Sequence, residues 1–163
     1  MLEITAASPL DIATDRGRLQ AAVRHVCIAC GVGTNAVGTA IYLRAAGGPI
    51  QPFASAGFCG EEIAELQSAL GEGPAFEAAR QNWPVFVPNL VDHAISVRWP
   101  LFSAAAITTG VEGVFAFPLA LGAEPIGSFE IHRDTGDALT PDEIVGAVQL
   151  AAVALTLLLD GER

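Results

Sequence analysis

Two pairs of β-rich segments, each joined by a very short connection, constrain the fold of this chain most strongly. The first pair is residues 38–45 and 50–58, around the turn signal Gly47-Gly48-Pro49, and the second pair is residues 113–119 and 125–133. Short connections make neighbouring strands antiparallel, because a parallel pair needs a crossover of about a dozen residues or more. The chain therefore predicts two β-hairpins in an antiparallel sheet.

Helical segments surround these hairpins. Helices are expected from residue 11 or 14 to 30, and then over residues 61–70, 74–80, 100–110 and 142–159, with Val85-Phe86-Val87 as a short additional strand. The last helix follows Thr140-Pro141-Asp142-Glu143, a capping pattern with proline at the first helical position. This order predicts an α+β fold with the long terminal helices on one face of the sheet and the short helices on the other. No repeat divides the chain, so a single domain over residues 1–163 is expected.

Composition narrows the class of protein. Of the 163 residues, 52% are hydrophobic and 16% are charged, which is typical of a compact globular domain with a large core. Eight arginines and no lysine stand against eighteen acidic residues, so the net charge is −10. Such a surface repels phosphate backbones and anionic lipids, which argues against direct binding to nucleic acid or to a membrane.

The two ends of the sequence bear on localisation. The N-terminal stretch MLEITAASPLDIATD lacks the basic start and the apolar segment of a secretory signal. The longest apolar run, residues 144–159, is short for a membrane span. A cytoplasmic protein is therefore expected.

Three cysteines, Cys27, Cys30 and Cys59, raise the question of redox or metal chemistry. Cys27 and Cys30 share a helical stripe with Val23 and Val26, so both thiols are expected in the core. A tetrahedral zinc site would need further ligands that this helix does not offer on the same face. No metal site is predicted.

Three stretches of the chain together resemble the GAF domain, a small-molecule-binding and regulatory module. They are LGEGPAFEAARQNWPVFVPNL, RWPLFSAAAITTGVEGVFAFPLALGAEPIGSFEIHR and LTPDEIVGAVQLAAVALTLLL, and the resemblance extends over about residues 15–159. The chain looks most similar to the GAF domains that precede an RNA-binding antiterminator domain, called ANTAR, in GC-rich bacteria. The resemblance implies a PAS- or profilin-like sheet of five to six strands, with a ligand pocket under the short helices.

The resemblance also implies a role in bacterial signal transduction and transcription regulation. ANTAR-linked relatives continue into the output domain at the point where this chain ends, at Arg163. The chain is therefore expected to be either an excised sensor domain or a stand-alone protein that acts through a partner.

The same resemblance indicates which residues face the pocket. Side chains alternate between the two faces along residues 125–133, and Phe129 and Ile131 suit the face packed on the long helices. Ser128, Glu130 and His132 then point to the face where GAF domains hold their ligands. Aromatic side chains that could wall the cavity are Phe86, Trp99, Phe102, Phe115 and Phe117. The alternative is core packing for the aromatics and solvent exposure for Glu130 and His132.

The turn Gly71-Glu72-Gly73 has two interpretations. A glycine-rich turn ahead of a helix can bind an anion through its backbone N–H groups. Here Glu72 lies between the glycines, and Pro74 removes one of the donors. A corner between two short helices is therefore the favoured interpretation.

Catalysis is the main alternative to binding, because some single-domain GAF proteins reduce free methionine sulfoxide with cysteines. Those reductases carry one cysteine where this chain has Ala75 and another where it has Ala104-Ala105-Ala106, and no cysteine follows Cys59. A thiolate nucleophile and a resolving thiol would both be required near the pocket. No catalytic role is expected, and the ligand or cofactor stays unspecified.

The last helix is apolar around nearly its whole circumference. One stripe contains Ile144, Ala147, Ala151, Ala154 and Leu158, and the other contains Val145, Val148, Ala152, Leu155 and Leu159. A helix that is hydrophobic on both sides must be covered on both. We expect one stripe to meet the sheet and the second to meet a partner, most simply the terminal helices of a second copy.

These observations favour a non-catalytic sensor or regulatory domain that binds a small molecule, dimerises through its first and last helices and signals to an output domain or a partner. Two alternatives stay open. One is a small-molecule-modifying GAF enzyme such as a free methionine sulfoxide reductase, and the other is a pure dimerisation module without a ligand.

Overall fold

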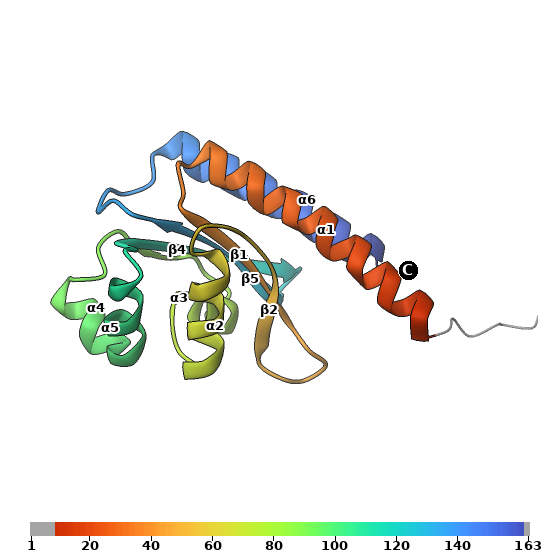
Figure 1. Ribbon diagram of the computed structural model, residues 1–163, viewed down its shortest axis with the longest axis horizontal. Helices are drawn as coiled ribbons and strands as arrows, with labels where there is room; N and C mark the ends of the chain where they lie inside the picture. Colours follow the sequence, from red (N-terminus) through yellow and green to blue (C-terminus); the bar gives the residue numbers. More distant parts are fainter. Residues whose placement is uncertain (1–8, 162–163) are drawn as a thin grey trace, which may run out of the picture.

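The centre of the molecule is a five-stranded antiparallel sheet in the order β2-β1-β5-β4-β3 (Figure 1). The computed structural model describes residues 9–161, with side chains from residue 14 on, so residues 1–8, the first part of the stretch that argued against a secretory signal, lie outside the described residues. The strands are β1 (Gly38–Arg44), β2 (Ile50–Gly57), β3 (Val85–Val87), β4 (Gly113–Leu121) and β5 (Glu124–Arg133). Both expected hairpins are present, β1 with β2 and β4 with β5.

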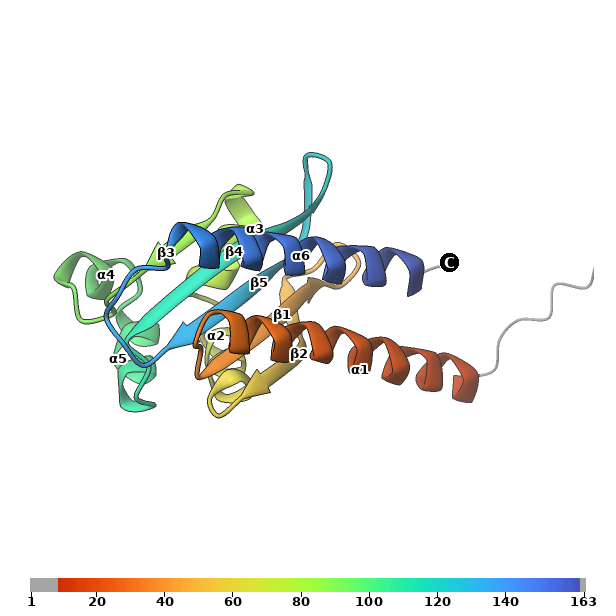
Figure 2. The same cartoon turned by 90° about the horizontal axis from the view of Figure 1, so that it is seen from above.

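The helices divide between the two faces of the sheet as the sequence predicts. The long helices α1 (Pro9–Gly33) and α6 (Pro141–Gly161) lie side by side on one face (Figures 1 and 2). They run antiparallel, because Gly161 at the end of α6 lies against Leu19 near the start of α1. The other face carries α2 (Gly60–Leu70), α3 (Pro74–Gln81), α4 (His93–Arg98) and α5 (Pro100–Thr108). The α+β fold expected from the two hairpins is confirmed.

One helix was not expected. Residues 93–98, which lie outside the helices expected from the sequence, form the short helix α4. The Asp92 side chain accepts a hydrogen bond from the backbone N–H of Ala94 at 3.1 Å and so satisfies a donor that the helix leaves free at its start. Pro100 then begins α5, as predicted.

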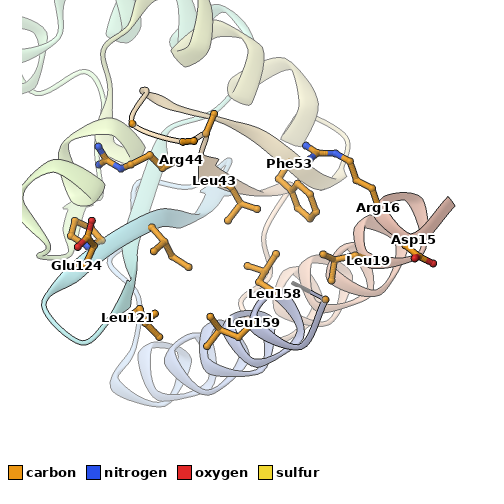
Figure 3. A pocket seen from close by; sticks show the side chains of 16 residues that line it. Asp15, Arg16, Leu19, Leu43, Arg44, Phe53, Leu121, Glu124, Leu158 and Leu159 are labelled. Carbon is orange, nitrogen blue, oxygen red and sulfur yellow. The ribbon is translucent and has the colours of Figure 1, made fainter. Parts of the chain in front are cut away.

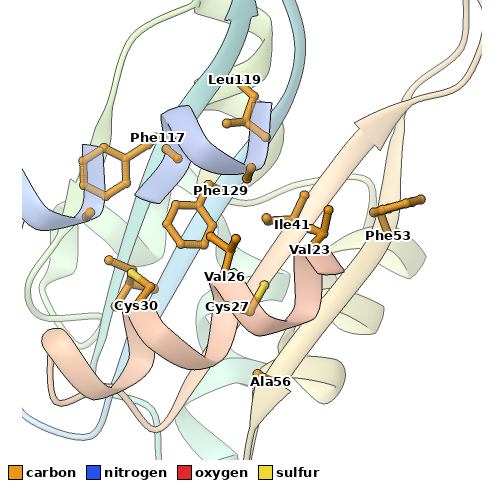
Figure 4. Packing of buried hydrophobic residues seen from close by; sticks show 14 of the residues in the cluster. Val23, Val26, Cys27, Cys30, Ile41, Phe53, Ala56, Phe117, Leu119 and Phe129 are labelled. Carbon is orange, nitrogen blue, oxygen red and sulfur yellow. The ribbon is translucent and has the colours of Figure 1, made fainter. Parts of the chain in front are cut away.

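The CxxC cysteines belong to the core between the long helices and the sheet. Cys27 and Cys30 pack with Val23 and Val26 of α1 against Phe129 of β5 (Figure 4). Burial raises the pKa of the Cys27 thiol to about 11 and that of the Cys30 thiol to about 12. Both thiols are therefore protonated at neutral pH, as expected of structural core residues.

A second apolar layer separates the sheet from the short helices. Helix α3 lies against β4 and β5 with small side chains, so its backbone approaches the sheet closely. Its alanines Ala75, Ala78 and Ala79 are all buried. Helix α3 thus packs directly on the sheet, and Gln67 of α2 reaches Glu130 of β5.

Helix α6 is the one helix among residues 9–161 that is long and apolar enough to cross a membrane by length and composition. It has 21 residues and so extends beyond the apolar run seen in the sequence. A core helix of a globular domain meets the same criterion, and α6 buries Ala147, Ala151, Ala154 and Leu158 in the core that it shares with α1.

Candidate functional site

Strand β5 places three polar side chains on the face covered by the short helices. Ser128, Glu130 and His132 alternate with Phe129 and Ile131, which lie in the core beneath α1 and α6. The orientation predicted for these residues is therefore the one that the structure has. Ser128, Glu130 and His132 are all completely buried, so the alternative of solvent exposure for Glu130 and His132 is wrong.

A hydrogen-bonded group, here called the polar cluster, forms around Glu130. The Glu130 Oε1 atom accepts hydrogen bonds from Tyr42 Oη at 3.0 Å and from Gln67 Nε2 at 2.6 Å. His132 Nε2 lies 2.6 Å from the same oxygen, and Gln67 Nε2 also donates to Tyr42 Oη at 2.8 Å. With Ser128, these residues form a fully buried polar layer between β1, β5 and α2. Burial, and then the nearby Glu130, raises the pKa of Tyr42 well above its usual value, so its hydroxyl stays a donor.

The orientation of Gln67 is fixed by the start of α3. The backbone N–H of Ala75 donates to Gln67 Oε1 at 3.0 Å, so the amide nitrogen of Gln67 must point the other way, toward Glu130. Gln67 thus connects the first turn of α3 to the sheet. Sequence reasoning missed both Gln67 and Tyr42, because a single polar residue within an apolar stripe carries no sign of its partner.

Three buried polar atoms of the polar cluster have no hydrogen-bond partner within the described residues. They are Ser128 Oγ, Glu130 Oε2 and His132 Nδ1. Buried polar groups are normally paired, and each exception calls for a ligand, a water molecule or a conformational change to complete it. The polar cluster therefore retains hydrogen-bonding capacity that the described part of the chain does not use.

The third cysteine lies at the His132 end of the polar cluster. A β-carbon on Gly38 would come within 2.8 Å of Cys59 Sγ and 2.9 Å of His132 Nδ1, so thiol and imidazole face the same glycine. Burial raises the pKa of the Cys59 thiol to about 11, and the negative charges of Glu62, Asp134 and Glu130 act in the same direction. The thiol is therefore protonated at neutral pH, which is unfavourable for a cysteine nucleophile.

The aromatic residues expected around the pocket divide between the two faces. Trp99 and Phe102 lie on the α2–α5 side, in the layer that contains Val114 and Ala116 of β4. The other three lie on the far side. Phe115 and Phe117 belong to the core beneath α1 and α6, and the Phe86 ring packs edge-on against both, at centroid distances of 5.7 and 5.1 Å. These three cannot wall a cavity that contains Glu130, because the sheet separates them.

Beside α3 lies an open groove of about 450 Å³. We call it the arginine groove, because Arg44, Arg80 and Arg98 all line it, together with Ile50, Phe76 and Trp99. Ile50 and Phe76 pack in the same apolar group as Tyr42, whose hydroxyl belongs to the polar cluster. Tyr42 therefore connects the apolar lining of the groove with the polar cluster, although no residue of the cluster lines the groove.

The turn Gly71-Glu72-Gly73 forms one edge of the arginine groove and is the corner that we favoured from the sequence. Gly71 ends α2 in a left-handed conformation, with φ of 65°, and Gly73 precedes the first residue of α3. Glu72 Oε1 accepts hydrogen bonds from the backbone N–H groups of Leu101 and Phe102, at 3.0 and 2.9 Å. The Gly71 N–H donates to the Gln67 carbonyl at 2.8 Å, and the Glu72 carboxylate caps the start of α5.

A second groove, of about 500 Å³, lies between the ends of α1 and α6 and the two hairpin tips. Figure 3 shows Leu19, Leu43, Phe53, Leu158 and Leu159 around its apolar interior. Leu159 also belongs to the outer stripe of α6 predicted as a dimer interface. This groove therefore continues the exposed apolar surface of the long helices.

The outer stripe of α6 faces away from the sheet. Val145 and Val148 are 55% and 51% exposed, Ala152 is exposed, and Leu155 and Leu159 are half-buried. On the neighbouring helix α1, Ile28 and Val32 are also exposed. We call these residues of α1 and α6 the outer helix face; within the described residues nothing covers them.

No family model matches this sequence, and no curated protein matches it either. Solved structures do match. A domain described as part of a two-component sensor histidine kinase from Sinorhizobium meliloti has a TM-score of 0.70 at 18% identity, over 90% of this chain and 92% of that one. The GAF domain region of a protein described as a membrane protein, from Geobacter sulfurreducens, has a TM-score of 0.70 at 17% identity, over 90% and 97%.

An enzyme is also among the similar structures. The type II free methionine-R-sulfoxide reductase from Thermoplasma acidophilum has a TM-score of 0.67 at 14% identity, over 90% of this chain and 96% of that one. At these identities the likeness concerns the fold alone. The chain therefore has the GAF fold, a fold that occurs in both sensor domains and an enzyme.

Proposed function

We propose that this protein is a non-catalytic regulatory domain that binds a small molecule on the α2–α5 face and dimerises through the outer helix face. The observation that carries the ligand-binding part is the polar cluster, in which Ser128 Oγ, Glu130 Oε2 and His132 Nδ1 are buried without partners within the described residues. A group whose only task was to stabilise the fold would be expected to satisfy its own polar atoms. The GAF fold in a sensor kinase domain supports the same function by analogy.

Strand β5 offers a direct route from ligand to output. Glu130 belongs to the polar cluster, whereas its chain neighbours Phe129 and Ile131 pack in the core beneath α1 and α6. Strand β1 adds a second connection, because the Thr39 hydroxyl donates to the backbone carbonyl of Cys27 in α1 at 2.9 Å. A ligand that shifts β5 or β1 would therefore bias the packing of the terminal helices, and through them a partner or output domain. We place this action in bacterial signal transduction, in the cytoplasm, with transcription regulation of the ANTAR-linked kind as the specific output.

Native mass spectrometry of protein purified under mild conditions tests ligand binding. We expect a co-purified small molecule on the wild-type chain, and its loss in Glu130→Gln. The control is Glu65→Gln, which removes an exposed carboxylate from α2 and should retain the molecule. A bare mass, followed by a thermal-shift screen in which no metabolite raises Tm, would contradict the proposal and leave a pure dimerisation module.

A reductase is the second candidate, because Cys59 faces His132 and a reductase shares the fold. The raised pKa of the Cys59 thiol argues against it. A thiol-dependent assay on free methionine sulfoxide decides the matter: turnover that disappears in Cys59→Ser would replace the regulatory proposal with an enzymatic one.

A further inference from the structure

We propose that the arginine groove binds a small organic anion, through a carboxylate or phosphate group that reaches Arg44 and Arg80. The inference rests on the proposed ligand-binding function and specifies the chemical class of the ligand. The net charge of the chain is −10, which by itself would favour a cationic ligand over an anionic one.

The distribution of cationic side chains supports an anion. The chain has eight arginines and no lysine, and three of those arginines line this one groove. Two acids, Glu72 and Glu77, also line it, so the groove keeps an excess of positive charge in an acidic molecule. In a partly enclosed groove such local excess attracts anions more strongly than the same charge on an open surface.

The two acids of the groove are already engaged. Glu72 Oε1 caps α5 by accepting from the N–H groups of Leu101 and Phe102. Glu77 Oε1 forms an ion pair with Arg98 and lies 3.9 Å from Arg80. A cationic ligand would have to compete with these partners for the two carboxylates. An anionic ligand would instead lie beside Arg80 and Arg98, which already bind the carboxylate of Glu77.

Arg44 and Arg80 are free to receive that group. Arg44 makes no ion pair within the described residues, and the Arg80 side chain is 79% exposed with only the long contact to Glu77. Arg98 is held more rigidly, because its guanidinium pairs with Glu77 and stacks over the Trp99 ring at 4.5 Å. The fixed Arg98 shapes the groove, and the other two arginines can close on the anion.

The body of the ligand would rest on apolar surface. Ile50, Phe76 and Trp99 line the groove, whose volume of about 450 Å³ suits a small molecule. Ile50 and Phe76 also pack with Tyr42, the hydroxyl of which contacts Glu130. Binding in the arginine groove would therefore reach the polar cluster through Tyr42.

Fluorescence of Trp99 provides the test. The chain has two tryptophans, so Trp83→Phe, at a side chain 71% exposed, leaves Trp99 as the only reporter. The probes are two matched pairs that share a non-absorbing ring: cyclohexyl phosphate with cyclohexanol, and cyclohexanecarboxylate with cyclohexanecarboxamide. At constant ionic strength we expect at least one anion to change the emission saturably, and neither neutral compound to do so.

Two charge variants identify the groove as the site. We expect Arg80→Gln, at an arginine that lines the arginine groove and not the second groove, to weaken binding of the anion about tenfold. Arg24→Gln, at an exposed arginine on α1, removes the same charge from the opposite side of the sheet and should leave affinity unchanged. The anion that binds more tightly shows whether the groove prefers a phosphate or a carboxylate group.

Three results would overturn the inference. They are equal binding of a neutral compound, equal affinities in the two arginine variants, and no saturable change with either anion up to about 10 mM. A neutral or cationic molecule found by native mass spectrometry would likewise exclude the anion, yet would support the proposed ligand-binding function. The two proposals can thus fail separately.

Discussion

Glu130 is the residue on which the polar cluster depends. One of its oxygens accepts from Tyr42 and Gln67 and contacts His132, and the residue is completely buried. Removal of the carboxyl group would leave three buried polar side chains without their shared partner. In a medium of low dielectric constant an unpaired buried polar group is costly, so the cluster should be sensitive to single changes.

Substitution of Glu130 tests this dependence. We expect Glu130→Ala to lower the free energy of unfolding by about 3 kcal/mol or more, and Glu130→Gln, which keeps an acceptor oxygen, to cost about 1–2 kcal/mol. Glu65→Ala, at an exposed site on α2, should stay within about 0.5 kcal/mol of wild type. Urea unfolding measures all three. Equal effects of the alanine and glutamine variants would show that hydrogen bonding to Glu130 contributes little.

The three buried thiols predict loss of stability at alkaline pH. Burial raises the pKa of Cys27, Cys30 and Cys59 to about 11, 12 and 11, whereas an unfolded thiol has a pKa of about 8.5. Between these values the unfolded chain releases protons that the folded chain keeps. The free energy of unfolding should therefore fall above about pH 9, by up to about 1.4 kcal/mol per pH unit for each thiol, with Tyr42 adding to the slope at higher pH.

The variant Cys30→Ala separates the thiol from other alkaline effects. The substitution will lower stability at every pH because it leaves a cavity, but only the slope bears on the thiol. We expect a slope shallower by about 1 kcal/mol per pH unit above about pH 9.5, measured by urea unfolding across the pH range. An unchanged slope would mean that Cys30 ionises in the folded chain.

Among the elements, the corner between α2 and α3 joins three parts of the molecule. Gln67 near the end of α2 reaches the sheet and the start of α3, and Glu72 in the turn caps α5. Gly73 allows the Gln67 side chain to pass close to the turn. Its φ is 136°, and a β-carbon there would collide with the Gln67 side chain. The glycine is therefore required both by its conformation and by the close passage of Gln67.

Alanine substitutions at the two glycines of the corner separate these effects. Gly71 has a φ of 65°, and a β-carbon added there would meet no neighbouring heavy atom within 4 Å, so Gly71→Ala should cost about 1 kcal/mol from backbone conformation alone. Gly73→Ala should cost about 3 kcal/mol or more, because it also displaces Gln67 from Glu130. Thermal and urea unfolding measure the difference. Similar costs at the two positions would contradict the role assigned to Gln67.

In the molecule as a whole, the sheet separates the two surfaces for which we propose different roles. The α2–α5 face contains the polar cluster and the arginine groove, and the opposite side presents the outer helix face of α1 and α6. Because β5 contributes Glu130 to one side and Phe129 to the other, the two surfaces share a single strand. The proposed coupling between ligand binding and assembly would therefore need no long chain of contacts.

The outer helix face predicts a dimer that one charge can disrupt. We expect sedimentation at micromolar concentration to show a wild-type dimer and a monomeric Val148→Glu, because burial of an unpaired carboxylate opposes association. Val97→Glu places the same change at an exposed valine on α4, 67% exposed, and should remain dimeric. A monomeric wild type would contradict the assembly part of the proposed function.

Much of the fold follows from local features of the sequence. The glycine-rich turn at Gly47-Gly48-Pro49 predicts the first hairpin, and the alternation along β5 correctly assigns Glu130 and Phe129 to opposite faces. The helix α4 was missed, because its six residues are too few to show a periodic pattern. Phe115 and Phe117 lie two residues apart on β4 and therefore share a face, but nothing local to β4 indicated which layer of helices that face would meet.

Turn chemistry and side-chain periodicity act over a few residues, so the antiparallel sheet, the division of long and short helices and the burial of Cys27 and Cys30 could be predicted from the sequence. The polar cluster and the arginine groove depend instead on how distant segments pack together. Tyr42 and Glu130 are separated by 88 residues, and Gln67 and Glu130 by 63. Contacts over such distances depend on how the elements pack, and no local pattern in the sequence records them.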